Sequence, residues 1–386
     1  MTTPGAPSAP PPQGGAPSGP AKPVPRLQLG TRGWTAVLIA VIVIAVLVPL
    51  LNLAVPDDSV FHLDDFYVGL AGKILCYAIC ALAMDLIWGY TGILSLGHGL
   101  FFALGGYGMG MYLMRQIGRD GQYKSDMPDF MVFLNWKEFP WTWAGSDSFV
   151  VQMLLVVLVP GLLAFVFGFF AFRSRIKGVY FSIITQALTF AAMLLFFRNE
   201  TGFGGNNGFT DFKRILGAPI TQNMKVLLFV LSGLTLVGFF LMSRAIINSK
   251  AGRVLQAIRD AETRVMFSGY DPVAYKLAIW TLSAVMCGVA GALYVPQVGI
   301  INPSEMSPAA GIEIAIWAAV GGRGTLIGPI IGAFFVNGAK SWFTVAFPEF
   351  WLFFLGAMFI AVTLFLPQGL LGLMQKVKRR LREKKA

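Results

Sequence analysis

Charge is scarce in this chain. Only 13% of its 386 residues are Asp, Glu, Lys or Arg, about half of the roughly 25% found in soluble domains. Hydrophobic residues make up 56%, and the mean hydropathy is +0.67. Because a water-soluble protein of this size needs more charge to cover its surface, the composition excludes a soluble globular protein and indicates an integral membrane protein.

Cysteine and histidine are also few. Three cysteines (Cys76, Cys80 and Cys287) lie in apolar segments, and the histidines are His62 and His98. These residues predict neither a disulfide framework nor a metal site. The chain also lacks a G-x-x-x-x-G-K-[ST] phosphate loop, a nucleophile elbow and a dinucleotide fingerprint. We therefore expect no catalytic residues, no metal and no cofactor, so that any energy input other than an ion gradient comes from another chain.

Proline and basic charge mark the two ends. Residues 1–33 form a Pro-rich arm that carries Lys22, Arg26 and Arg32, and its composition predicts disorder rather than a signal peptide. Residues 376–386 form a basic tail directly after an apolar segment. Such clusters mark cytoplasmic ends beside anionic lipid headgroups. Both termini are therefore expected in the cytoplasm, with membrane lipid and not nucleic acid as the partner of the tail.

Ten apolar segments between these ends have about the length, roughly 20 residues, that crosses a membrane. They are 34–54, 68–88, 93–114, 149–172, 178–197, 225–244, 273–295, 309–321, 326–345 and 350–372. The eighth and ninth are uncertain as separate spans, because the sequence GGRG at 321–324 divides one continuous apolar stretch. We expect an all-α fold, a polytopic membrane helix bundle of eight to ten and most simply ten transmembrane helices, within one domain of residues 34–375.

Polar residues inside apolar sequence are candidates for a solute path, because a charge or a hydrogen-bonding group there is costly unless it is paired or faces water. The candidates for the path are Ser95, His98, Tyr180, Gln186, Thr189, Asn206, Asn207 and Glu313. Two further polar residues are Lys73 and Asp85, of which Asp85 lies near a span end and can reach the membrane surface. No paired-charge site is evident, so the mostly uncharged set favours a small neutral polar solute.

Two glycine-rich segments that carry four of these candidates allow alternatives. Ser95 and His98 belong to the glycine-rich run 89–99, which suits a helix break that faces a cavity, although close helix packing also explains the glycines. Asn206 and Asn207 belong to the glycine-rich loop 201–208, which is either an external turn or a re-entrant gating loop.

Residues 253–269 predict a short cytoplasmic helix. Asp260 and Arg264 form an i,i+4 pair, and Gly269 suits the helix stop. Three apolar side chains on this helix would be exposed to water if nothing covered them: Ile258, Val265 and Met266. A groove in a partner protein best explains them, and a helix that lies on lipid is the alternative.

Several segments resemble the permeases of the branched-chain amino acid class of ABC importers. They are GYTG…LSLGHG at 89–99, AIRD at 257–260, YKL at 275–277 and GGRGTLIGP at 321–329. More narrowly, DLIW at 85–88, GMYLM at 110–114 and the stretch 201–217 resemble the second permease subunit of the urea ABC importer. The resemblance covers about residues 65–375.

The resemblance implies an ABC importer permease fold in the bacterial cytoplasmic (inner) membrane. It implies four partners: a second homologous permease subunit, two ATP-binding subunits and an external solute-binding protein. It also assigns residues 253–269 to the coupling helix that sits in a groove of an ATP-binding subunit. The coupling residues implied by this assignment are Arg259, Asp260, Glu262, Arg264 and Gly269.

We therefore expect a permease subunit that forms half of a transmembrane path for urea or short amides, driven by ATP hydrolysis in partner chains. Branched-chain amino acids are the near alternative, and their carboxylate and ammonium groups favour a paired-charge or helix-terminus site. A secondary transporter or channel that acts alone, with Glu313 as a proton site, is a different class. A structural role without transport is the third possibility.

Overall fold

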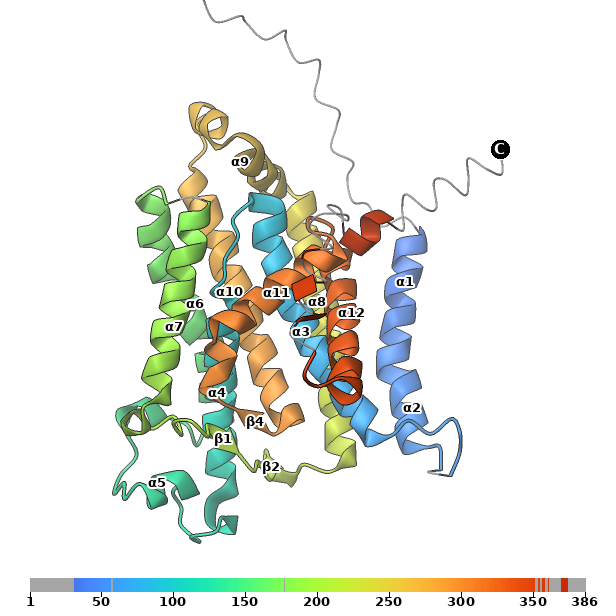
Figure 1. Ribbon diagram of the computed structural model, residues 1–386, viewed down its shortest axis with the longest axis vertical. Helices are drawn as coiled ribbons and strands as arrows, with labels where there is room; N and C mark the ends of the chain where they lie inside the picture. The colour runs from blue at the N-terminus through green and yellow to red at the C-terminus, as the bar shows by residue number, and fades with distance from the viewer. Residues whose placement is uncertain are drawn as a thin grey trace, which may run out of the picture.

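The computed structural model describes residues 31–56, 58–176 and 178–350, together with short stretches between 353 and 373. Most of the predicted arm, the basic tail and most of the predicted last span 350–372 lie outside these residues. The described chain forms a bundle of long helices that run side by side (Figure 1). The expected all-α membrane bundle is therefore confirmed.

Among the described residues, six helical segments are long and apolar enough to cross a membrane. The first is Gly33–Leu53, in which α1 (Thr31–Ile42), the π-helical η1 (Val43–Leu47) and α2 (Val48–Leu53) follow one another. The other five are α3 (Asp65–Thr91), α6 (Phe149–Arg173), α7 (Val179–Phe197), α8 (Gln222–Asn248) and α10 (Pro272–Val298). Each coincides with a predicted apolar span.

Three further helices complete this part of the bundle. The helices α4 (His98–Ile117) and α12 (Ile327–Ala346) have 20 residues each, whereas α11 (Pro308–Gly321) has 14. At 1.5 Å per residue, α11 is about 21 Å long, less than the roughly 30 Å of a hydrocarbon core. The segment before it, with β4 (Ile300–Ile301) and η5 (Pro303–Met306), leads the chain back from the end of α10. The doubtful stretch 309–345 is therefore a short oblique helix followed by a longer one (Figure 1).

The two ends of the bundle differ. The helix α9 (Lys250–Phe267) projects at one end, which we call the α9 end, and α5 (Asp129–Phe133) lies at the opposite α5 end (Figure 1). At the α5 end, β1 (Phe209–Thr210) pairs antiparallel with β4, and β2 (Arg214–Ile215) pairs with β3 (Ala218–Pro219). Short helical turns complete the loops of this end, namely η2 (Gly118–Asp120), η3 (Trp141–Trp143) and η4 (Asn199–Thr201).

The helix α10 lies at the centre and packs against α3, α4 and α6. Glycines allow α4 and α10 to touch backbone to backbone, since a Cβ at Gly105 would lie 1.9 Å from the Gly288 carbonyl oxygen. A Cβ at Gly291 would lie 1.8 Å from the Phe102 carbonyl oxygen. Small residues produce such close contacts between membrane helices, and this packing accounts for glycines that follow the run at 89–99.

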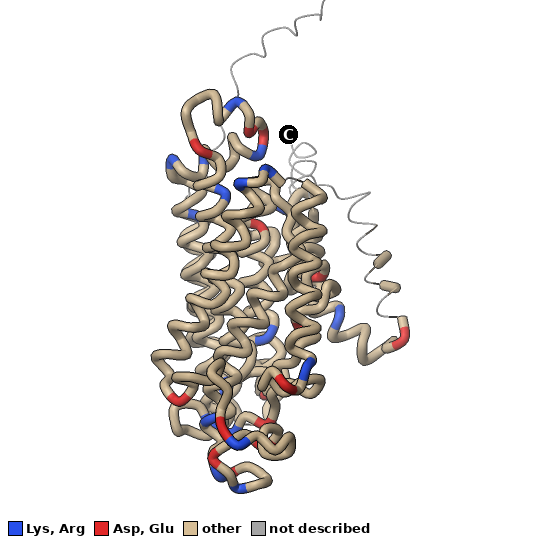
Figure 2. The backbone as a smooth tube through the Cα atoms, turned by 90° about the vertical axis from the view of Figure 1, so that its left-hand side faces the viewer, with Lys and Arg blue, Asp and Glu red and all other residues tan. Residues whose placement is uncertain are grey.

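Charged residues gather at the two ends of the bundle, and few lie between them (Figure 2). The long helices expose many large apolar side chains on their outer faces, such as Leu154, Leu162 and Leu227. An apolar belt between two charged ends is the surface that a bilayer requires. The few charges inside the belt therefore need a specific explanation.

Candidate solute path and coupling site

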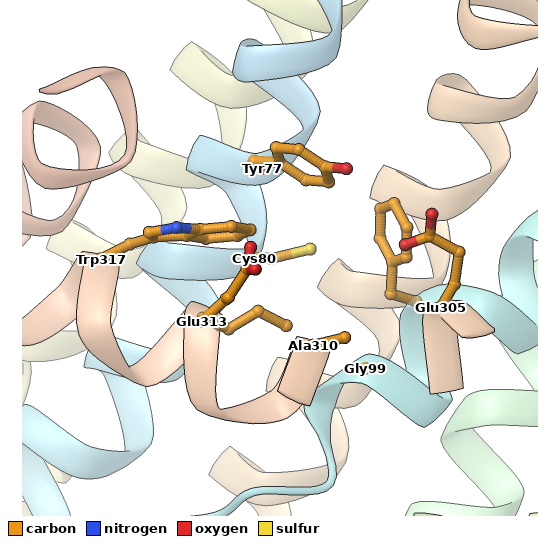
Figure 3. Close-up of a pocket in the computed structure, with 9 residues that line it drawn as sticks. Tyr77, Cys80, Gly99, Glu305, Ala310, Glu313 and Trp317 are labelled. Carbon is orange, nitrogen blue, oxygen red and sulfur yellow. The ribbon is translucent and has the colours of Figure 1, made fainter. Parts of the chain in front are cut away.

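A small cavity lies between α3, α4, η5 and α11, with a volume of about 30 Å3. Tyr77 and Cys80 come from α3, while Glu313 and Trp317 come from α11 (Figure 3). Glu305 lies on the other side of the space, in η5. A site of this size holds about two water molecules, and carboxylate oxygens and aromatic rings dominate its walls.

Opposite charges surround this cavity. The Lys340 ammonium on α12 contacts both carboxylate oxygens of Glu313, at 2.9 and 3.0 Å. The Tyr294 hydroxyl on α10 donates to Glu305 Oε1 at 3.2 Å. The Lys73 ammonium lies 5.7 Å from the centre of the Tyr77 ring. Two lysines and two glutamates thus form a charged cluster inside the bundle, with tyrosines between them.

This cluster corrects the sequence analysis, which found no paired-charge site. Glu313 was predicted as a path residue, but its partner Lys340 lies 27 positions further along the chain on another helix. Glu305, Tyr77 and Tyr294 were missed as well. The available signal was a lysine inside the apolar stretch 326–345, because charges within membrane spans mark functional sites.

Ser95 lies within a helix break, as predicted, and His98 begins the helix that follows it. The chain between α3 and α4 is not helical from Gly92 to Gly97, and α7 satisfies part of its backbone. Ser182 donates to the Leu94 carbonyl oxygen at 2.8 Å, and Thr185 Oγ1 accepts from the Leu96 amide at 3.2 Å. Ser95 and His98 are both fully buried.

The break does not bring these two side chains to the cavity. His98 Nε2 lies 3.2 Å from Ser283 Oγ on α10, and its ring packs edge-on against Trp280 with 5.5 Å between centres. Ser95 Oγ accepts from the Gly97 amide at 3.1 Å. In this structure both residues hold the broken segment in place, and Gly99 is the member of the run that lines the cavity.

The predicted path residues of α7 also lie away from the cavity. Tyr180 is 74% exposed on the outer face of the bundle, and Gln186 is half-buried. Thr189 is buried and donates to the Thr185 carbonyl oxygen at 2.8 Å. None of these three side chains lines the cavity beside Glu313.

Asn206 and Asn207 are exposed in a turn at the α5 end. Four glycines of that loop have positive φ, namely Gly202, Gly204, Gly205 and Gly208, and the strand pair β1–β4 fixes the position of the loop. Asn207 borders a surface groove of about 660 Å3, together with Asp129 and other loop residues. This placement matches the external-turn alternative more closely than the gating loop.

The predicted coupling helix is α9, which is kinked at Ala261, where φ is −158° and ψ is 73°. Its inner face packs onto the bundle, so Ile258 and Val265 are only 3% and 7% exposed. The expectation that both would be open to water is therefore wrong, because this chain covers them itself. The apolar side chains that remain open are Met266, Phe267 and Tyr270, at 45%, 88% and 50% exposed.

The five predicted coupling residues divide into two groups. Arg259 Nη1 donates to the Gly89 carbonyl oxygen at 2.8 Å, and Glu262 forms an ion pair with Lys276 of α10. These two side chains connect α9 to its own bundle, although Arg259 also forms an ion pair with Asp260 at 2.9 Å on the exposed side of α9. Asp260, Arg264 and Gly269 are exposed. Asp260 and Arg264 line a shallow groove of about 700 Å3 along α9, which offers a surface for a partner.

The helical membrane fold agrees with what comparison with known proteins shows. The family model described as "Branched-chain amino acid transport system / permease component" matches residues 66–363. The chain belongs to this family. It is therefore a multi-pass membrane transport component and not an enzyme, and the match extends over the cavity, the cluster and α9.

Three relatives illustrate the range of the likeness. The high-affinity branched-chain amino acid transport system permease protein LivM of Salmonella typhimurium is 24% identical over 92% of this chain and 79% of its own length. BraD of Pseudomonas aeruginosa, a permease protein of the same kind of system, is 21% identical over 77% of this chain and 91% of its own. The ribose import permease protein RbsC of Bacillus subtilis is 27% identical over 36% of this chain and 42% of its own. No solved structure matches the chain.

Proposed function

We propose that this chain is one of two permease subunits of an ATP-driven importer and forms half of its transmembrane path. The observation that carries the proposal is the charged cluster around Glu313 and Lys340, inside the apolar belt of the bundle. In this assembly two ATP-binding subunits dock at the α9 end and an external solute-binding protein docks at the α5 end. Both termini then lie on the cytoplasmic side of a bacterial inner membrane.

The exposure of the cluster supports a second permease subunit. The side chains of Lys340 and Glu313 are 37% and 21% exposed, although they lie on helices of the membrane bundle. Charged groups that face lipid are costly, whereas charges that face a water-filled path or another subunit are tolerated. A homologous permease that covers this side of α11 and α12 would place the cluster along a path between the two subunits.

A branched-chain amino acid is the first cargo to test. LivM and BraD are named as permeases of branched-chain amino acid systems, and the cluster provides both signs of charge. An amino acid carries a carboxylate, which Lys73 or Lys340 would attract, and an ammonium, which Glu305 or Glu313 would attract. These are the paired charges that such a cargo favours.

Urea or a short amide is the second cargo, and the cavity itself favours it. The cavity is small, and neither Lys73 nor Lys340 belongs to its lining. The walls include two carboxylates and three aromatic rings, which accept N–H donors and pack against a planar amide. The likeness of residues 85–88, 110–114 and 201–217 to a urea permease points the same way.

Uptake by the complete assembly decides between these cargoes. The permease pair, the ATP-binding subunits and the solute-binding protein are reconstituted in vesicles and supplied with ATP, and uptake of labelled leucine and labelled urea is measured in parallel. ATP-dependent leucine uptake supports the first cargo, and ATP-dependent urea uptake with no leucine uptake supports the second. Uptake by this chain alone, driven by a proton gradient, would instead identify a secondary transporter.

A further inference from the structure

The last two turns of α3 hold the loop 322–326, which joins α11 to α12. Asp85 is fully buried by other parts of the chain. One of its carboxylate oxygens accepts from the Gly324 amide, and the other accepts from the Leu326 amide at 3.0 Å. Hydrogen bonds to a charged group are stronger than neutral ones. The loop is therefore fixed to α3 by a side chain in the interior of the bundle.

The loop also lies directly on the surface of α3. A Cβ at Gly89 would lie 2.6 Å from the Gly324 amide nitrogen, so no side chain fits between the two backbones. The Arg323 guanidinium lies 5.3 Å from the centre of the Trp88 ring on the same helix. With the Asp85 hydrogen bonds, these contacts make the loop and this part of α3 one packed unit.

The helix α9 contacts the same turn of α3. The helix α3 ends at Thr91. The carbonyl group of Gly89 is therefore one of the last four of α3, which lack an intrahelical partner. Arg259 Nη1 donates a hydrogen bond to this carbonyl oxygen at 2.8 Å. A Cβ at Gly92 would lie 3.0 Å from Arg259 Cγ, and Gly92 has φ +75°. A cation at a helix C-terminus is also favourable.

We propose that Arg259, Gly89 and Asp85 form a relay that passes displacement of α9 to the loop 322–326. The helices on either side of this loop carry Glu313 and Lys340, so the relay connects the α9 groove with the charged cluster. Asp85 and Arg259 are positioning residues that act through α3 and touch no solute. The relay rests on the proposed function in one respect, namely that ATP-binding subunits dock on α9.

Hydrogen exchange in the assembled complex tests the relay without knowledge of the cargo. Exchange of peptides that cover residues 320–330 is compared with and without a non-hydrolysable ATP analogue. We expect the nucleotide to change exchange there in the unaltered protein and to have little effect in Arg259→Ala. Thr263→Ala is the control, because Thr263 is exposed on α9 and lines neither the groove nor the contact with α3, and this variant should respond like the unaltered protein.

Transport efficiency gives the second measurement, as solute imported per ATP hydrolysed. Loss of a hydrogen bond to a charged group corresponds to a change of about tenfold or more in an equilibrium constant. We therefore expect Arg259→Ala to lower this ratio about tenfold while ATP hydrolysis continues. The contacts act in series, so breaking either one interrupts the relay. The double variant Arg259→Ala/Asp85→Asn should therefore import no less solute per ATP than the single variant with the lower ratio. If Asp85→Asn does not fold, Trp88→Leu takes its place.

Two results would overturn the relay. One is an unchanged nucleotide response of residues 320–330 in Arg259→Ala, and the other is a multiplicative loss of transport per ATP in the double variant. Failure of the ATP-binding subunits to associate with the unaltered chain would be a different result, because it would contradict the proposed function itself. Measurement of that association before the exchange experiment separates the two cases.

Discussion

Replacement of Gly291 by alanine tests the helix packing at the centre of the bundle. A Cβ at this position would lie 1.8 Å from the Phe102 carbonyl oxygen and 2.9 Å from the Gly106 amide nitrogen. Ordinary contacts of a Cβ begin at 3.4 Å, so α4 and α10 would have to separate by about 1.6 Å. Both obstacles are backbone atoms, and neither can move aside by a change of rotamer.

The expected free-energy change combines two effects of opposite sign. Overpacking of a core costs about 1–3 kcal/mol, and the upper end applies where backbone blocks the new atom. Alanine in place of glycine favours a helix by about 1 kcal/mol. We therefore expect Gly291→Ala to lower the free energy of unfolding by about 2 kcal/mol.

Gly238→Ala is the matched control for this prediction. Gly238 lies within α8, and a Cβ there would meet no atom within 4 Å. The control variant should be unchanged or more stable by up to about 1 kcal/mol. Thermal unfolding in detergent, followed by tryptophan fluorescence, measures both variants. Equal midpoints for the two variants would refute the close approach of α4 and α10.

Three further predictions test the site and its surroundings. Glu313→Gln should lower the free energy of unfolding by about 1–3 kcal/mol, between the values for exposed and buried ion pairs. The double variant Glu313→Gln/Lys340→Met should regain part of this loss of stability in the same unfolding assay. Phe267→Ser should weaken binding of the ATP-binding subunits by about 1–3 kcal/mol, as measured by a pull-down titration. Trp141→Ser is the control, because its ring is equally exposed but lies at the α5 end. This control should leave binding unchanged. Asp271→Ala should cost about 1 kcal/mol of stability, because Asp271 accepts from the Val273 amide at 3.0 Å, and an unchanged midpoint would contradict the capping role.

Local sequence was enough to predict most of the bundle. Apolar segments of sufficient length predicted the long helices, because every helix that crosses the lipid needs a similar run of apolar residues. Charge and a terminal glycine predicted the helix of residues 253–269, and glycines with small neighbours predicted the break beside Ser95. These features depend on residues near one another in the chain, and the structure places them where the pattern indicated.

The side-chain partners could not be predicted in this way. The partner of Glu313 is Lys340, and that of Asp85 is the loop 322–326, more than 200 positions away. The direction of Arg259 and Glu262 toward the bundle depends on the kink in α9. Each of these contacts depends on how helices that are distant in the sequence pack together. A single sequence does not specify that packing.

ATP-dependent uptake with and without the ATP-binding subunits tests the central claim most directly. Vesicles that contain both permease subunits and the solute-binding protein are compared with vesicles that also contain the ATP-binding subunits, at equal permease content and with ATP supplied. We predict concentrative uptake only in the complete assembly, and its loss when the non-hydrolysable analogue replaces ATP. Equal uptake by the two preparations would contradict the assignment of this chain to an ATP-driven importer.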